Sequence, residues 1–130
     1  MNPWAVRSDE ALAIALGDAR AEAARLERRV LLVFVGFHDP DSEAVVRALA
    51  EAPARLEIRE RYLPLFVNVG REGTEHVQLR RAHDVRKLAT LVVLEATGHR
   101  VARQTFSPVS ELRPVSSAAL AQWLSAPHGR

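Results

Sequence analysis

Four side chains that can do chemistry lie within one short segment, His38-Asp39-Pro40-Asp41-Ser42. An imidazole near a hydroxyl can act as base and nucleophile, and an imidazole with carboxylates can hold a metal ion. The same residues also suit the start of a helix, because an aspartate accepts hydrogen bonds from the first amide groups and a proline tolerates the first helical position. Capping, catalysis and metal binding are therefore three interpretations of one segment, and capping is the favoured one.

Ser42 lacks the neighbours that a serine nucleophile requires. Such a serine needs an adjacent base and an oxyanion pocket, and the base needs a third group that orients it. His38 is close in sequence, but no third partner is evident. The sequence therefore predicts no catalytic residue and no enzyme activity.

Metal ligation by the histidines has little support. His38, Asp39 and Asp41 share one segment without a fourth ligand, whereas a structural site usually gathers four. His76 and His83 lie on a predicted helix at a spacing that matches no strong ligand pattern. We predict no metal and no other cofactor.

The charge balance argues against a nucleic-acid partner. The 130 residues include 18 basic and 16 acidic side chains, for a formal net charge of +2. The basic residues between positions 71 and 87 could form a stripe, but few aromatic residues lie between them for base stacking, and neighbouring acids repel phosphate. We therefore expect no binding to nucleic acid.

The chain contains no cysteine, which excludes a disulfide scaffold and any thiolate metal site. Its longest apolar stretch, residues 30–37, is far shorter than the roughly 20 residues that cross a bilayer. Residues 1–10 show neither a basic start followed by an apolar run nor a small-residue cleavage signal. We expect no membrane association and a cytoplasmic location.

Hydrophobic periodicity predicts the first two elements. Apolar residues recur at three- and four-residue steps from Ser8 to about Arg28, which indicates an amphipathic helix that Ser8 can cap. Residues 30–35 include no polar residue, as is typical of a central strand covered on both faces. Helices must therefore lie on both sides of the predicted sheet.

The remainder of the chain alternates between helices and strands before it closes with a hairpin and a helix. We expect helices from the Asp39-Pro40 step to Pro53, over 54–62 and over 75–83, strands over 63–69, 90–94 and 101–106, and a last helix capped by Ser116 or Ser117. This order predicts one α/β domain, residues 1–130 with a core of about 8–124. It has a central mixed sheet of four or five strands, helices on both faces and an antiparallel C-terminal hairpin.

Three segments resemble the thioredoxin superfamily, in particular its bacterial members that open with a long helix before the first central strand. They are residues 30–34 leading to 39–42, residues 66–69 and residues 85–98, of which the last is the most specific. Family members typically have Gly-Val-Arg-Gly-Ile-Pro-Thr-Leu there, followed by an apolar strand, an acidic residue and a glycine turn. The resemblance spans about residues 8–124 and implies a thioredoxin-like fold.

Both signatures of that family are altered in this chain. Asp39 and Ser42 stand where the family has its two cysteines, so thiol–disulfide exchange is impossible from this chain, and Ala89 stands at the cis-proline position. Since a cis bond before alanine costs roughly 2.5–4 kcal/mol, we predict a trans peptide at Leu88–Ala89. The same alignment places His83 at a common tyrosine position, which predicts a partly buried packing role.

The resemblance also implies that the loop carrying Arg86 and Lys87 approaches the altered motif. A pair of either residue with an aspartate of the motif would be a solvated surface pair worth roughly 0–1 kcal/mol, or part of a polar recognition patch. We predict a protein-binding rim. Its residues are Phe37, His38, Asp39, Pro40, Asp41, Ser42, Arg86, Lys87, Leu88 and Ala89.

A non-redox module that binds another protein, or acts as a chaperone-like accessory, is accordingly the leading function. Two alternatives stay open. One is an enzyme with non-thiol chemistry at His38, Asp39 and Ser42, which predicts a closed pocket with shifted pKa values. The other is a self-associating structural subunit, which predicts a solution mass that depends on concentration.

Overall fold

The computed structural model describes residues 2–108 and 115–126. Its elements are α1 (Asp9–Leu26), β1 (Arg29–Val35), α2 (Pro40–Leu49), α3 (Ala54–Arg61), β2 (Tyr62–Asn68), α4 (Val77–Ala82), β3 (Thr90–Leu94), β4 (Arg100–Thr105) and α5 (Ser117–Ser125). The predicted order of helices and strands is confirmed. Among the described residues, we find no helix with the length and apolar character that a membrane span requires.

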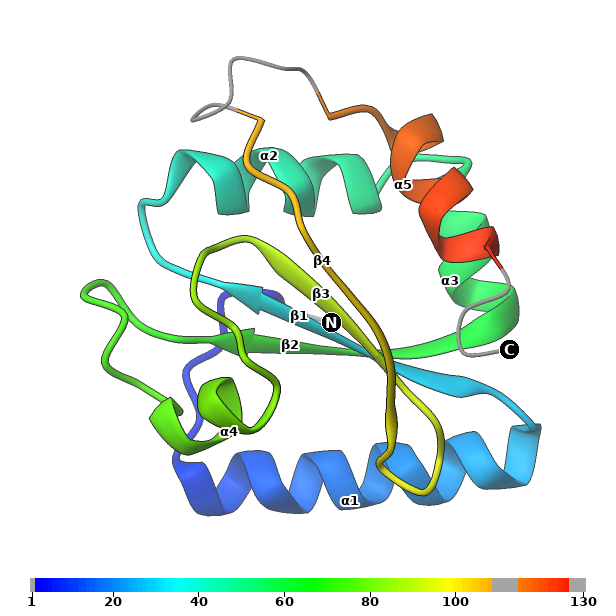
Figure 1. Ribbon diagram of the computed structural model, residues 1–130, viewed down its shortest axis with the longest axis horizontal. Helices are drawn as coiled ribbons and strands as arrows, with labels where there is room; N and C mark the ends of the chain where they lie inside the picture. Colours follow the sequence, from blue (N-terminus) through cyan, green and yellow to red (C-terminus); the bar gives the residue numbers. More distant parts are fainter. Residues whose placement is uncertain (1, 109–114, 127–130) are drawn as a thin grey trace.

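The strands form one mixed sheet in the order β2-β1-β3-β4 (Figure 1). β1 runs parallel to β2, with Arg29 opposite Tyr62 and Val35 opposite Asn68. β3 runs antiparallel to both β1 and β4. The predicted α/β fold with a mixed sheet and an antiparallel hairpin is confirmed, with four strands in the described part of the chain.

β1 is a central strand because both of its faces are apolar. Val33 and Val35 pack with apolar residues of α2 and α5, whereas Leu32 and Phe34 pack with residues of α1. All four side chains are fully buried. Figure 1 shows α1 and α4 on one side of the sheet and α2, α3 and α5 on the other. The prediction that helices cover both faces is therefore confirmed.

Serine side chains cap the N-termini of the first and last helices. The Ser8 hydroxyl accepts a hydrogen bond from the Ala11 N–H at 3.0 Å, and the Ser116 hydroxyl accepts one from the Ala119 N–H at 3.0 Å. The sequence left Ser116 and Ser117 as alternative caps of the last helix, and Ser116 is the cap of α5. Ser117 is instead buried. Its hydroxyl accepts from the Ala54 N–H at 2.9 Å and donates to the Glu51 carbonyl at 2.7 Å.

Ser117→Ala is expected to lower the free energy of unfolding by about 1–2 kcal/mol, because it leaves the buried N–H of Ala54 without an acceptor. Ser125→Ala is the matched control. The Ser125 hydroxyl is exposed and donates to the Gln122 carbonyl of its own helix, so its loss should cost less than about 0.5 kcal/mol. Urea denaturation of both variants measures the difference, and equal midpoints would contradict the bridging role of Ser117.

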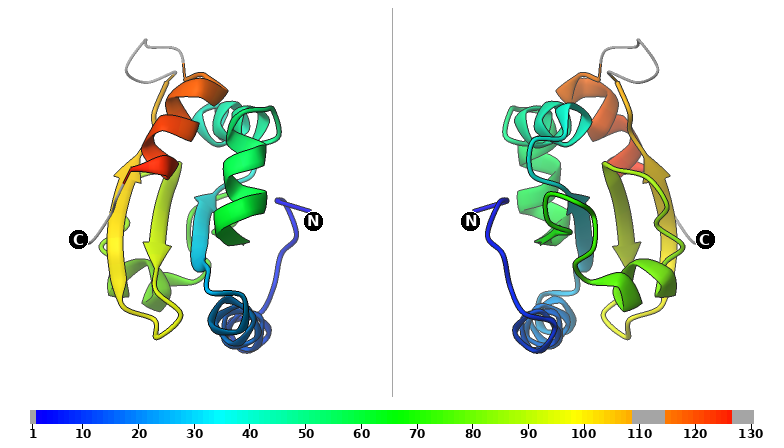
Figure 2. Two further views of the ribbon diagram at one scale, coloured as in Figure 1. Left: turned by 90° about the vertical axis from the view of Figure 1, so that its right-hand side faces the viewer. Right: turned by 90° about the vertical axis from the view of Figure 1, so that its left-hand side faces the viewer.

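The segment before α1 lies along the β2 side of the sheet (Figure 2). The Arg7 guanidinium donates to the Phe66 carbonyl at 3.3 Å, and the Asn68 side-chain amide donates to the Trp4 carbonyl at 3.1 Å. The Trp4 ring stacks on Phe37 with centroids 6.4 Å apart. These contacts attach the segment both to an edge strand and to the chain that follows β1.

Candidate functional site

The altered motif forms the start of α2. Asp39 is the N-cap residue, and its Oδ2 accepts hydrogen bonds from the Ser42 N–H at 2.9 Å and from the Ser42 hydroxyl at 2.6 Å. Pro40 begins the helix, where a missing N–H has no consequence. The predicted helix cap is confirmed.

The Ser42 hydroxyl bridges the end of β1 and the start of α2. Ser42 is fully buried, and its Oγ accepts a hydrogen bond from the Gly36 N–H at 3.1 Å while it donates to Asp39. The exposed His38 ring instead contacts Arg71, with Nε2 3.1 Å from Nη2. Within the described residues no imidazole is hydrogen-bonded to Ser42, so the segment has the geometry of a cap and not of a nucleophile with its base.

Gly36 lets the loop before β3 approach the end of β1. A Cβ atom on Gly36 would lie 2.9 Å from Cδ1 of Leu88 and 3.4 Å from the backbone oxygen of Gly70. Such distances are shorter than close-packed atoms adopt without a shift. The loop of residues 84–89 therefore lies directly beside the motif, and its predicted approach is confirmed.

The Leu88–Ala89 peptide is cis, so the predicted trans bond is wrong. The prediction followed from the intrinsic preference of the dipeptide alone. In the folded chain, the N–H of the buried Ala89 donates to the Phe106 carbonyl at 3.3 Å, and its carbonyl accepts from the Phe106 N–H at 2.8 Å. The Ser107 hydroxyl donates to the Leu88 carbonyl at 3.2 Å. The backbone here is fixed by partners that are distant in sequence.

A groove lies between the altered motif and β4. It has a volume of about 680 Å³ and is lined by Asp39, Asp41, Lys87, Leu88, Gln104, Thr105 and Ser107. A second hollow of about 510 Å³ is also lined by Lys87, Gln104 and Thr105, and it continues along Asp84, Arg86 and Arg103. We call the two hollows together the polar groove, because nearly all of the described residues that line them are polar.

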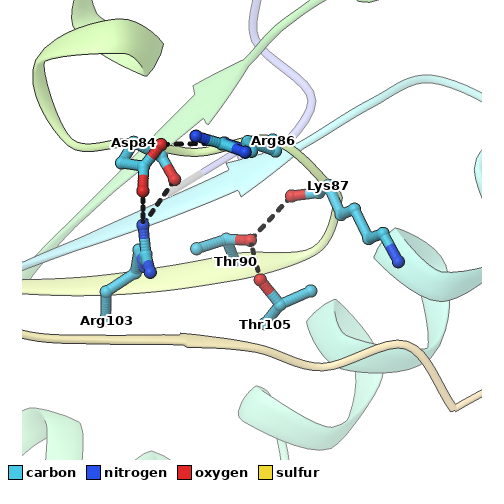
Figure 3. Close-up of polar contacts among 6 residues, drawn as sticks. All are labelled: Asp84, Arg86, Lys87, Thr90, Arg103 and Thr105. Carbon is cyan, nitrogen blue, oxygen red and sulfur yellow. Dashed lines mark hydrogen bonds and ion pairs between the residues drawn. The ribbon is translucent and has the colours of Figure 1, made fainter.

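Threonine hydroxyls join the two walls of the polar groove (Figure 3). The Thr90 hydroxyl donates to the Lys87 carbonyl at 2.6 Å. Because its one proton is used there, it accepts a hydrogen bond from the Thr105 hydroxyl, which lies 2.7 Å away. Thr90 and Thr105 are directly opposite each other in the β3–β4 register. The hairpin register therefore sets the position of the loop relative to β4.

The Asp84 carboxylate pairs with Arg86 of its own loop and with Arg103 of β4. The Arg86 Nε donates to the Asp84 carboxylate at 2.9 Å, and the Arg103 Nη1 donates to it at 2.8 Å. Among the described residues, neither Arg86 nor Lys87 forms an ion pair with an aspartate of the motif. Arg86 pairs with Asp84 because that carboxylate lies on the same loop. The Lys87 ammonium extends away from this cluster (Figure 3) and makes no hydrogen bond or ion pair with a described residue.

Hydrogen bonds from Arg103 and Arg86 hold the pKa of Asp84 below its ordinary value. Arg103→Gln is expected to raise the Asp84 pKa, because it removes the largest cause of the shift, and Arg100→Gln on the same strand should leave it in place. Since the pKa of Asp84 is lower in the folded chain than in the unfolded chain, the ionised carboxylate stabilises the folded state at pH values above the unfolded pKa. This contribution to stability is lost as the pH falls through the folded pKa. In Arg103→Gln that loss moves to higher pH. NMR titration of the Asp84 carboxyl carbon measures the shift, and an unchanged pKa would contradict the assignment.

The predicted rim residues occupy four environments. Those that line the polar groove are Asp39, Asp41, Arg86, Lys87 and Leu88. Ser42 and Ala89 are buried beneath it, and Pro40 is exposed at the helix start. Phe37 and His38 face Trp4 and Arg71. The structure thus brings half of the predicted rim together along one groove.

Sequence reasoning missed the far wall of the polar groove. Gln104, Thr105 and Ser107 come from the end of β4 and the residues after it. Nothing in their types indicates a site. The available signal is the hairpin itself, because pairing Thr90 with Thr105 places the next residues of the chain beside the loop at 84–89.

The histidines take part in pairing and packing. The buried His76 has Nδ1 2.8 Å from Oδ1 of Asp9. His83 is half-buried, and burial together with the nearby Arg100 lowers its pKa, so its predicted packing role is confirmed. Among the described residues, no group of three or more histidine, aspartate or glutamate side chains is placed to hold a metal ion.

No protein-family model matches the sequence, and no curated protein matches it. Solved structures do match the fold. A disulphide isomerase from Xylella fastidiosa Temecula1 superposes with a TM-score of 0.78 at 17% identity, over 96% of this chain and 95% of that chain. The DsbD C-terminal domain of Neisseria meningitidis in the oxidised form gives 0.69 at 18% identity, over 92% and 96%. A thioredoxin from Thermus thermophilus gives 0.61 at 24% identity, over 82% and 78%.

This chain has a thioredoxin fold. Identities this low carry the fold and nothing of the activity. Thiol–disulfide exchange proceeds through attack by a thiolate, and a chain without cysteine supplies none. The thioredoxin fold of this chain therefore presents, at the start of α2, an aspartate and a serine that hydrogen-bond to each other.

Proposed function

We propose that this chain is a non-redox protein-binding module, a chaperone-like accessory to a partner, and that the polar groove is its binding surface. The observation that carries the proposal is the arrangement of that groove. The carboxylate of Asp39 and the buried Asp41 line the groove at the start of α2, and the ammonium of Lys87, on the loop beside the motif, has no partner among the described residues. An extended segment of another protein can offer a donor to the Asp39 carboxylate and a carboxylate to Lys87.

Binding is favoured over catalysis because the reactive groups of the motif are already engaged. The Ser42 hydroxyl donates its proton to Asp39 and accepts from the Gly36 N–H, and the fully buried residue offers no accessible oxygen for attack on a substrate. The His38 ring contacts Arg71. What stays accessible along the groove are polar groups suited to recognition, such as Lys87 and Gln104.

Lys87→Glu is expected to weaken partner binding by about tenfold, because it replaces the one cation among the described residues that line the hollow beside the motif with a further acidic group beside the carboxylates of Asp39 and Asp41. Arg59→Glu is the charge-matched control. Arg59 is exposed on α3 and does not line the polar groove. The measurement is photo-crosslinking from a benzophenone amino acid at position 104 in cells that express the protein, followed by affinity measurement with the captured protein.

The proposal requires one protein that crosslinks to wild type and to Arg59→Glu, and that is lost with Lys87→Glu. A set of crosslinks that is identical in all three chains would contradict it. Crosslinks to a second copy of the chain, with a solution mass that rises with concentration, would replace it by self-association.

A further inference from the structure

We propose that a groove between α2, α3 and β2 binds an aliphatic carboxylate, with the hydrocarbon chain in the groove and the carboxylate on Arg55. The groove has a volume of about 330 Å³. It shares no residue with the polar groove, so the site is separate from the one proposed for a protein partner.

The walls of this second groove are hydrocarbon. Pro64 and Phe66, alternate residues of β2, point to the same face of the sheet and line it. Val46 and Leu49 of α2 and Ile58 of α3 line it from the helices. Water in such a space makes few hydrogen bonds, so an alkyl chain that replaces it gains the hydrophobic contribution of its own buried surface.

The segment before α1 adds a further wall through Pro3. Figure 2 shows the N-terminal end of this segment on the same side of the molecule as α3. The neighbouring Trp4 is held by the Asn68 amide and by the Phe37 ring. The segment therefore narrows an open face into a groove.

Arg55 supplies the charge that selects the head group. It is the charged residue among the described residues that line the groove, and none of these residues offers its guanidinium a hydrogen bond or an ion pair. A guanidinium matches a carboxylate with two parallel N–H···O bonds. A single planar cation beside an apolar space thus favours a carboxylate that carries a hydrocarbon chain.

The dimensions favour a small molecule over a protein segment. A volume of about 330 Å³ is near the lower end of the range of roughly 300–1,000 Å³ that ligand pockets occupy. An aspartate or glutamate side chain of a protein partner could reach Arg55. Its few methylene groups would, however, leave apolar lining residues such as Val46 and Phe66 uncovered. A fatty acid of medium length covers them.

Isothermal titration calorimetry with decanoate, below its critical micelle concentration, tests the proposal, and decanol serves as the uncharged analogue. We expect decanoate to bind wild type more tightly than decanol, and Arg55→Gln to lose about threefold to fivefold in decanoate affinity with little change for decanol. Arg59→Gln, one helical turn further along α3 and outside the groove, is the matched control and should bind as wild type does.

Ala50→Phe and NMR locate the ligand. Ala50 is exposed and lines the groove, so a phenyl ring there fills the space without disturbing the core, and decanoate binding should be lost. In wild type, the methyl signals of Val46, Leu49 and Ile58 should shift on titration. Absence of binding, equal affinity for decanoate and decanol, or shifts confined to other residues would each overturn the proposal.

Discussion

Asp39→Ala is expected to lower the free energy of unfolding by about 2–3 kcal/mol. The alanine removes the cap acceptor of the Ser42 N–H, a loss of about 1 kcal/mol. It also leaves the buried Ser42 hydroxyl without the carboxylate to which it donates, which costs about another 1–2 kcal/mol. Asp39 is thus expected to matter for stability before it matters for any partner.

Asp39→Asn separates the contribution of these hydrogen bonds from that of the negative charge of Asp39. The amide oxygen of asparagine still accepts both hydrogen bonds, and asparagine is as good an N-cap as aspartate, so this variant should retain more than about half of the stability that alanine loses. Urea denaturation followed by circular dichroism measures all three proteins. If Asp39→Ala unfolds at the wild-type midpoint, the hydrogen bonds between Asp39 and Ser42 do not hold the start of α2.

Gly36→Val is expected to lower the free energy of unfolding by about 3 kcal/mol, at the upper end of what overpacking in a core costs. Its Cβ would lie 2.9 Å from Leu88 and 3.4 Å from the backbone oxygen of Gly70. The Leu88 side chain can rotate, but the Gly70 backbone continues directly from β2 and cannot. The valine methyl groups add volume where no space exists.

Gly17→Val is the matched control for this substitution. Gly17 lies within α1, and a Cβ atom there would meet nothing within 4 Å. Because valine is a somewhat better helix residue than glycine, the control should stay within about 0.5 kcal/mol of wild type or exceed it. Equal losses at positions 17 and 36 would show that the effect comes from the valine itself and not from the approach of the loop at 84–89.

The elements of this fold were predictable where the deciding interactions are local or periodic. The apolar run at residues 30–35 marked a strand covered on both faces, because no polar side chain there could face water. The start of α2 was predictable because the cap residue and the amide that it binds are three positions apart. Ser8 indicated the start of α1 for the same reason.

The candidate site was predictable only in part, because its second wall depends on contacts between distant residues. The pairing of Thr90 with Thr105 and the hydrogen bonds between Ala89 and Phe106 follow from the register of β3 and β4. That register contains an irregularity at Val93 and Leu94, which a pattern of alternating residues does not reveal. The peptide before Ala89 was mispredicted because its conformation depends on this register. The pairing of Arg86 with Asp84 was not foreseen because it depends on a neighbour within the loop.

The contacts along the edge of β2 affect how readily a strand from another chain could pair with this sheet. Sheets grow by templating when an edge offers free backbone groups to a strand from another chain. On β2, the Phe66 carbonyl is already occupied by Arg7, and Pro64 has no N–H to offer. On β4, an incoming strand would have to accommodate the charges of Arg100 and Arg103. Both edges therefore disfavour growth of the sheet by addition of a strand from another chain.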